Sequence, residues 1–182
     1  GLADVGGSLP KALRTLGHDV RVVMPAYHAI EAGLPAGRYG LRALPFELQV
    51  PMGTGLTPAG VLEAELPGSD VPVYFVAAKH MFDRPQLYGY WDDVGRFCFF
   101  SRAALDLIQA LDWRPDIVHT HDWQTAPAVT WLATTGQADE RRLTETQWRR
   151  ADGSTFRAAV SVTEAPEDGA GAYVAVFQAR TE

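Results

Sequence analysis

The sequence predicts an α/β protein with a parallel sheet, followed by a small antiparallel β meander. Two observations predict the first part. A helix-spaced apolar series leads directly into a short β-branched run near residue 20, and a second strand, at 116–121, ends in polar residues before another helix. The third observation is an Asp-Gly turn between two strand-like runs beyond residue 140, which predicts an antiparallel hairpin.

Composition excludes several classes of protein. The chain has 182 residues, of which 47% are hydrophobic, so it can bury a core and is not disordered. Its net charge of −6 argues against binding to nucleic acid or an anionic membrane, and no apolar run approaches the ~20 residues of a membrane span. No secretory leader is evident, and the single cysteine, Cys98, has no internal partner, so we expect a cytoplasmic protein.

The first elements follow from apolar spacing. Leucine and valine at intervals of three and four predict a helix over residues 1–16, which Gly17 ends. Pro10 lies within this pattern and predicts a kink or a later start. The β-branched run at 20–24 directly after the helix predicts a buried parallel strand.

The middle of the chain, residues 27–76, is rich in proline and glycine. We predict strands at 46–50, 61–66 and 71–76, with an antiparallel element among them. The helical period returns over residues 94–111.

The sequence next predicts a strand at 116–121, a polar tip and a helix at 123–134. This arrangement forms ligand sites in open α/β sheets. Alternation puts His119 and His121 on one face of the strand, with Asp122 at its tip. Asp122 either contacts a ligand or caps the following helix. The three residues are metal-ligand types, but further ligands are not evident, so no metal is expected. For His119 the favoured interpretation is a hydrogen-bonded buried histidine.

Several blocks of sequence resemble the opening of bacterial glycogen synthases and plant starch synthases, in the family's order, across residues 1–139. These blocks are GLADV at 1–5, SLPKAL at 8–13, GHDVRVVMP at 17–25, FDRP at 82–85, RF at 96–97 with FSRAAL at 100–105, and RPDIVHTHDW at 114–123.

The resemblance implies a retaining glucosyltransferase with two Rossmann-like domains in the GT-B arrangement and a site between them. It implies transfer of glucose from ADP-glucose to the non-reducing end of an α-1,4-glucan, without a metal or redox cofactor. Asp122 matches the family's active-site aspartate and is the expected catalytic residue. The expected substrate-binding residues are Asp4, Tyr88, Asp92, His121 and Trp123.

Several of these residues also have a structural alternative. Asp4 lies in the first turn of the predicted helix, where an acidic residue is favourable without any ligand, and Trp123 equally anchors the helix after it. Of Asp92 and Asp93, we expect one to cap the helix that follows and the other to contact the acceptor.

The sequence departs from the family in two ways. It begins at the second glycine of the family's Lys-x-Gly-Gly-Leu motif, so the first strand and the donor-binding lysine are absent, and the Rossmann-like domain is expected to be incomplete. The Thr-Val/Ile-His-Asn strand and the phosphate-binding second domain are absent too. We therefore predict little or no turnover by this chain alone.

The tail, residues 140–182, is similar to the last three strands of PAS sensory domains, which predicts a division of the chain at about residue 139. Three alternatives to the enzyme fragment remain open: a non-catalytic α-glucan-binding module, a PAS-like sensory or interaction protein, and a fusion with no selected function. The sequence does not indicate an oligomeric state.

Overall fold

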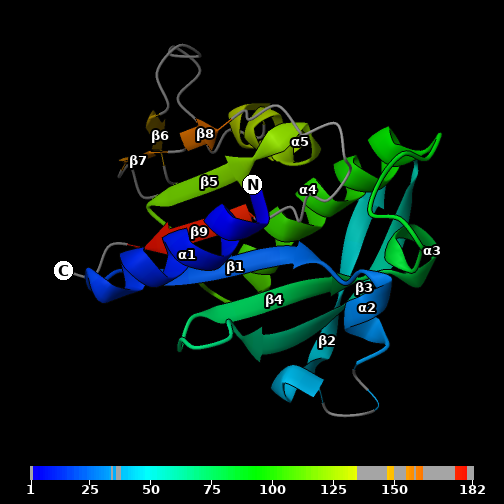
Figure 1. Cartoon of the computed structure of the whole chain (residues 1–182). Helices are drawn as coiled ribbons and strands as arrows, with labels where there is room; N and C mark the ends of the chain where they lie inside the picture. Colours follow the sequence, from blue (N-terminus) through cyan, green and yellow to red (C-terminus); the bar gives the residue numbers. More distant parts are fainter. Residues whose placement is uncertain are drawn as a thin grey trace.

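The computed structural model describes residues 2–33, 35 and 38–134, together with the backbone of four later strands (Figure 1). The helices are α1 (Leu2–Thr15), α2 (His28–Glu31), α3 (Lys79–Phe82), α4 (Asp93–Ala110) and α5 (Asp122–Thr134), with a 3₁₀ turn at Arg38–Gly40. The strands are β1 (Asp19–Pro25), β2 (Arg42–Met52), β3 (Gly55–Glu65), β4 (Pro72–Ala77), β5 (Ile117–His121), β6 (Gln147–Arg149), β7 (Thr155–Arg157), β8 (Ala159–Ser161) and β9 (Ala175–Ala179).

A seven-stranded mixed sheet forms the centre of the molecule, in the order β2-β3-β4-β1-β9-β5-β8. β1 and β4 are parallel, β3 is antiparallel to both β2 and β4, and β9 is antiparallel to both of its neighbours. Because β1 and β5 are each antiparallel to β9, they run in the same direction. The carboxyl ends of β1, β4 and β5 therefore lie at one edge of the sheet, and the predicted α/β class is confirmed.

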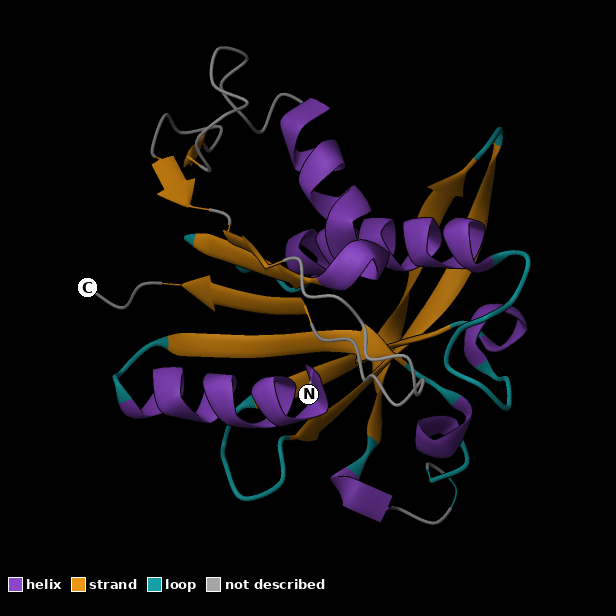
Figure 2. Ribbon diagram, turned by 45° about the horizontal axis from the view of Figure 1, so that its top comes forward, coloured by secondary structure: helices purple, strands orange, loops and turns teal. Residues whose placement is uncertain are grey.

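Helices cover both faces of this sheet (Figure 2). Along β1, Val20 and Val22 pack in one apolar cluster with Leu13 of α1. Val23 points to the opposite face and belongs to a second cluster, which contains the phenylalanines of α4 and Leu132 of α5. The alternation of a strand thus separates two cores, one under α1 and one under α4 and α5.

The helix at the start of the chain ends where the sequence predicts. Gly17 has a φ of +89°, in the left-handed region that glycine enters without a Cβ penalty, and the backbone N–H of His18 donates to the carbonyl of Leu13. Pro10 lies inside α1, whose first residue is Leu2, so the later start allowed by the sequence does not occur.

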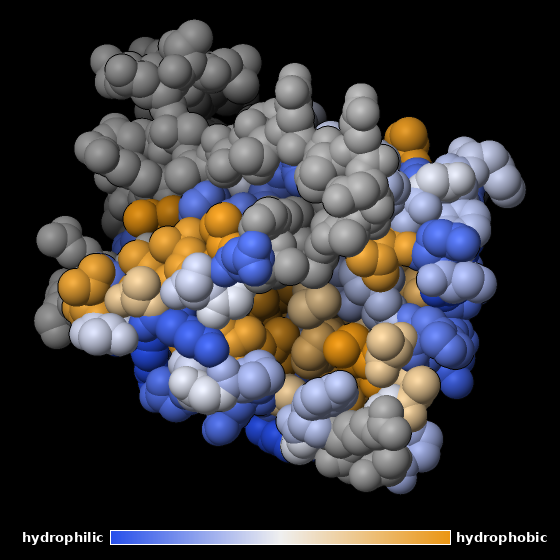
Figure 3. Space-filling view, viewed as in Figure 1, coloured by the Kyte–Doolittle hydropathy of each residue, from blue (hydrophilic) through white to orange (hydrophobic). Residues whose placement is uncertain are grey.

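Two basic side chains attach α1 to the turn between β3 and β4. Arg14 forms an ion pair with Asp70 at 2.7 Å, and Lys11 Nζ donates to the carbonyl of Pro67 at 2.5 Å. These contacts fix the helix over its face of the sheet. Apolar residues gather over α1 on the surface in Figure 3, where Leu16 and Val5 are exposed.

The predicted antiparallel element is a hairpin of two long strands, β2 and β3. Both strands have 11 residues and extend beyond the predicted ranges. The hairpin turns at Gly53, whose φ is +59°, and its register shifts between Ala43 and Glu47. β3 is longer than predicted because its backbone pairs with β2 on one side and with β4 on the other.

The tail strands do not form a separate meander. β6 and β7 pair antiparallel around the predicted Asp-Gly turn, which confirms that hairpin, but the turn itself lies outside the described residues. β8 instead pairs parallel with β5, and β9 lies between β1 and β5. The meander prediction is wrong for β8 and β9 because their backbone groups pair with the main sheet rather than with each other.

Within the described residues, no helix is both long enough and apolar enough to span a bilayer.

Candidate functional site

Residues predicted to be functional follow the carboxyl ends of the parallel strands. β1 leads into α2 and β4 leads into α3, and His28 Nδ1 lies 2.5 Å from Asp83 Oδ1 across the two short helices. β5 is followed directly by Asp122. α1 runs back along β1, so its first turn, with the exposed Asp4, lies toward the same edge (Figure 1). Open α/β sheets bind their ligands at this edge.

Asp122 forms the junction between β5 and α5. Its φ is +63°, a left-handed conformation that aspartate tolerates better than most residues. The residue is only 4% exposed, and burial raises the pKa of its carboxyl group. Asp122 is the first residue of α5, and its non-helical φ is that of a junction between strand and helix. Contact with a ligand and capping of α5 both stay predictions for this residue.

The two histidines of β5 lie on one face, as alternation predicts. Their rings stack with centroids 4.4 Å apart. His121 is 2% exposed, and burial together with the neighbouring His119 lowers its pKa to about 4, so its ring is neutral near pH 7. Among the described residues, no group of three or more potential metal ligands is present.

Polar atoms without partners surround this junction. Of the buried side-chain atoms without a hydrogen-bond partner in the described part of the chain, four lie here: Thr120 Oγ1, His121 Nε2, and the oxygen and nitrogen of the Gln124 amide. Buried polar groups are normally paired, and each one left unpaired costs about 1–3 kcal/mol. An unpaired cluster at the tip of a strand therefore fits a site that a polar ligand completes. Thr120 and Gln124 were not among the predicted site residues, although each lies two residues from Asp122.

Trp123 anchors α5 as the structural alternative predicts. Its ring packs edge-on against Phe97 of α4, with centroids 5.4 Å apart, yet the residue remains 45% exposed. Ser101 Oγ donates to the backbone carbonyl of Gln124 at 3.1 Å and joins the same two helices. The exposed part of Trp123 leaves a ring surface available beside the junction.

Residues 83–92, which we call the aromatic loop, connect α3 to α4. Asp92 accepts two hydrogen bonds of 2.6 Å from Arg84, which lowers the pKa of the Asp92 carboxyl group. Asp93 Oδ2 accepts from the backbone N–H groups of Gly89 and Tyr90. Both carboxylates thus hold the loop. Asp92 stands at the N-cap position of α4, as predicted for one of the pair, but makes no side-chain cap hydrogen bond.

The aromatic side chains of this loop differ in exposure. Tyr88 is partly buried against the core beneath α4. Trp91 is 96% exposed. The loop therefore presents one large aromatic ring to solvent.

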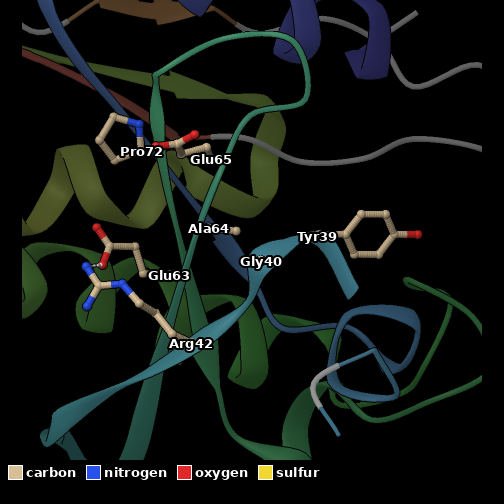
Figure 4. A pocket seen from close by; sticks show the side chains of 7 residues that line it. All are labelled: Tyr39, Gly40, Arg42, Glu63, Ala64, Glu65 and Pro72. Atoms are coloured by element: carbon tan, nitrogen blue, oxygen red, sulfur yellow. Dashed lines mark ion pairs between the residues drawn. The ribbon is translucent and has the colours of Figure 1, made fainter. Parts of the chain in front are cut away.

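A cavity of about 230 Å³ lies elsewhere, beside the hairpin (Figure 4). Arg42 and Glu63 form an ion pair in its wall, and the ring of Tyr39 points away from them. Its lining includes Pro72, the first residue of β4, so it lies at the amino-terminal edge of that strand. It is separate from the residues around Asp122.

Comparison with known proteins identifies the family. The model of the starch synthase catalytic domain matches residues 1–148. Glycogen synthase 1 of Geobacter metallireducens is 48% identical over 145 residues, which are 76% of this chain and 28% of that protein. Glycogen synthase 1 of Geobacter sulfurreducens is 49% identical over 140 residues, 74% of this chain and 27% of that protein.

A solved structure agrees with these relatives. The catalytic domain of starch synthase IV from Arabidopsis thaliana, bound to ADP and acarbose, superposes with a TM-score of 0.64 and 35% identity. The match covers 72% of this chain and 26% of that one. The chain thus spans about a quarter of the length of the proteins it matches. The similarity of the tail to PAS domains finds no support, since the family match continues to residue 148.

The family model matches residues 1–148, and two glycogen synthases are nearly 50% identical in sequence to this chain over the aligned residues. Together with the arrangement of the sheet, these matches show that the chain belongs to the starch synthase catalytic domain family.

Proposed function

We propose that this chain is the acceptor-facing part of a retaining glucosyltransferase, which transfers glucose from ADP-glucose to the non-reducing end of an α-1,4-glucan. Family membership supports the proposal, as does a related starch synthase that binds ADP and acarbose. The observation that carries it in this chain is the strained and buried Asp122, next to polar atoms that have no partner in the structure. Strain and unpaired polar groups of this kind concentrate at functional sites.

In the reaction, the bond between the anomeric carbon and the diphosphate breaks, and a bond from that carbon to the 4-hydroxyl oxygen of the acceptor forms. ADP leaves, and the hydroxyl proton is released. Asp122 is the proposed catalytic residue, whose carboxylate accepts a sugar hydroxyl and faces the positive charge that develops at the anomeric carbon. Neutral His121 and the Gln124 amide offer further hydrogen bonds to hydroxyl groups.

The remaining proposed contacts come from the surrounding elements. Trp123 and Tyr88 offer ring surfaces to sugars, Asp4 faces the donor, and Asp92 faces the acceptor. Asp92 does so while bound to Arg84, which keeps it ionised and fixed in place. The proposed chemistry uses no metal.

We expect this chain to bind glucan, and its sequence predicts little or no turnover of donor. The test is the affinity for maltoheptaose, measured by isothermal titration calorimetry, for the chain and for Asp122→Asn. Asparagine keeps the shape of the side chain and tolerates the left-handed backbone. We expect weaker binding by Asp122→Asn at unchanged melting temperature. Equal affinity of both proteins would remove Asp122 from the site.

The second candidate, a glucan-binding module without catalysis, is favoured by the exposed Trp91. Both candidates predict little or no ADP release by this chain, so a coupled assay of ADP release tests that shared expectation and the variants separate the candidates. Release by the chain with ADP-glucose and maltoheptaose would contradict the expected inactivity. Binding that is lost in Trp91→Ala or Tyr88→Ala, with no ADP release, supports the binding module.

A further inference from the structure

One fully buried charge, Arg96, lies beneath the aromatic loop. Its side chain is 0% exposed, and Nε pairs with Asp93 Oδ1 at 2.8 Å one turn earlier in α4. The guanidinium also lies 4.5 Å from the ring of Phe97 and 5.2 Å from that of Tyr90. Burying an ion pair costs desolvation energy that apolar residues of similar size avoid, so stability alone does not explain it.

The pair holds the aromatic loop through its backbone. Arg96 donates to the carbonyls of Met81 and Leu87, on either side of the bend that opens the loop. Asp93, held by Arg96, accepts from the N–H groups of Gly89 and Tyr90. A planar guanidinium with several fixed donors can satisfy these acceptors at once, whereas a lysine cannot reproduce the fork.

The Tyr90 ring contacts two guanidinium groups. The Arg84 group is 4.9 Å from the ring centroid on the loop itself, and the Arg96 group is 5.2 Å from it. The Tyr90 hydroxyl accepts from the backbone N–H of Gln86 at 3.0 Å. The neighbour of Tyr90 is the 96% exposed Trp91, so this packing fixes the backbone that presents the indole.

Arg96 also connects the aromatic loop to the junction at Asp122. Phe97 lies against Arg96 on one side and against Trp123 on the other, with ring centroids 5.4 Å apart in the second contact. The contacts run from Tyr90 through Arg96 and Phe97 to Trp123 without a gap. Trp91 and Trp123 are therefore both attached to one network of packed side chains.

We propose that Arg96 is a positioning residue, which fixes the aromatic loop so that Trp91 forms a glucan-binding surface in register with Trp123. This rests on the proposed function, because the ligand is the same glucan chain. Arg96 itself does not touch the glucan. Its effect on binding passes entirely through the backbone of the loop.

Limited proteolysis tests the positioning without any ligand. Chymotrypsin cuts after exposed aromatic residues, so it reports the opening of the loop at Tyr88, Tyr90 and Trp91. In Arg96→Lys we expect cleavage there to be about tenfold faster than in the unsubstituted chain. Cleavage after Tyr39, which is 64% exposed and lies outside the loop, is expected to keep its rate.

Arg102→Lys is the matched control for this experiment. Arg102 lies on the same helix and pairs with Asp106 at 3.1 Å, one turn further along α4. Asp93→Asn provides a second variant that breaks the ion pair at its other end and keeps the side-chain shape. Unchanged cleavage of the loop in both Arg96→Lys and Asp93→Asn would overturn the proposal, as would faster cleavage at Tyr39 by the same factor.

Glucan affinity tests the consequence for the ligand. By calorimetry with maltoheptaose, we expect Arg96→Lys to raise Kd as much as Trp91→Ala does, and the double variant to bind no more weakly than Trp91→Ala alone. An opened loop with unchanged Kd would overturn the link to the glucan. If the unsubstituted chain does not bind maltoheptaose, both the proposed function and the proposed glucan-binding surface fail. The proteolysis experiment still decides whether Arg96 positions the loop.

Discussion

The left-handed backbone at Asp122 has a measurable signature in the free energy of unfolding. A residue with a Cβ pays about 1–2 kcal/mol in this conformation, and glycine does not. At an ordinary helical position the order of the two variants is reversed, since a protein with glycine there is about 1 kcal/mol less stable than one with alanine. We therefore expect Asp122→Gly to be more stable than Asp122→Ala by about 1 kcal/mol.

Urea unfolding followed by circular dichroism measures this difference, because both variants lack the carboxylate and differ only in the Cβ. The matched control is Val94, which lies in the first turn of α4 and is 69% exposed. There we expect Val94→Ala to be more stable than Val94→Gly. If alanine is also the more stable residue at position 122, the strained junction does not exist in solution, and the argument for a site built around it loses its support.

Three further predictions concern stability. Gly17→Ala should lower the free energy of unfolding by about 1 kcal/mol, measured in urea, because φ is +89° at this helix end. Arg14→Ala should lower it by less than about 1 kcal/mol, since its ion pair with Asp70 is solvent-exposed and is screened further by added salt. The pKa of His121 is lowered to about 4 in the folded chain, so the unfolded chain binds the proton more readily. Its contribution to stability should be present above about pH 6.5 and fall as the pH drops toward 4, and His121→Gln should weaken this pH dependence of unfolding.

The helices α1, α4 and α5 and the strands β1 and β5 could be predicted from sequence because their signals are local, whereas the short helices α2 and α3 were not predicted. The apolar spacing that ends at Gly17 defines α1, and the run at Val20 to Met24 defines β1, with no knowledge of distant partners. The stacking of His119 on His121 follows from strand alternation in the same way.

The remaining features depend on contacts between distant residues. The pairing of β9 with both β1 and β5 is decided by which backbone groups are free, and no spacing within residues 175–179 encodes it. The left-handed backbone of Asp122 is permitted by the residue type but not required by it. Arg96 carried a local signal, because an acidic residue three positions before it is the spacing of a helical ion pair. Its role for the aromatic loop became visible only with the backbone carbonyls that it meets.

The insertion of β9 determines the order in which the sheet can be completed. β1 to β4 leave the ribosome early and hold a hairpin and a parallel pair of their own, but the inner edges of β1 and β5 receive their partner only when residues 175–179 have been synthesised. Pairing of strands that lie far apart in the sequence carries a loop-closure cost and is slow. The inner edges of β1 and β5 therefore stay unpaired until residues 175–179 have been synthesised, and in this interval nascent chains are most prone to associate with one another.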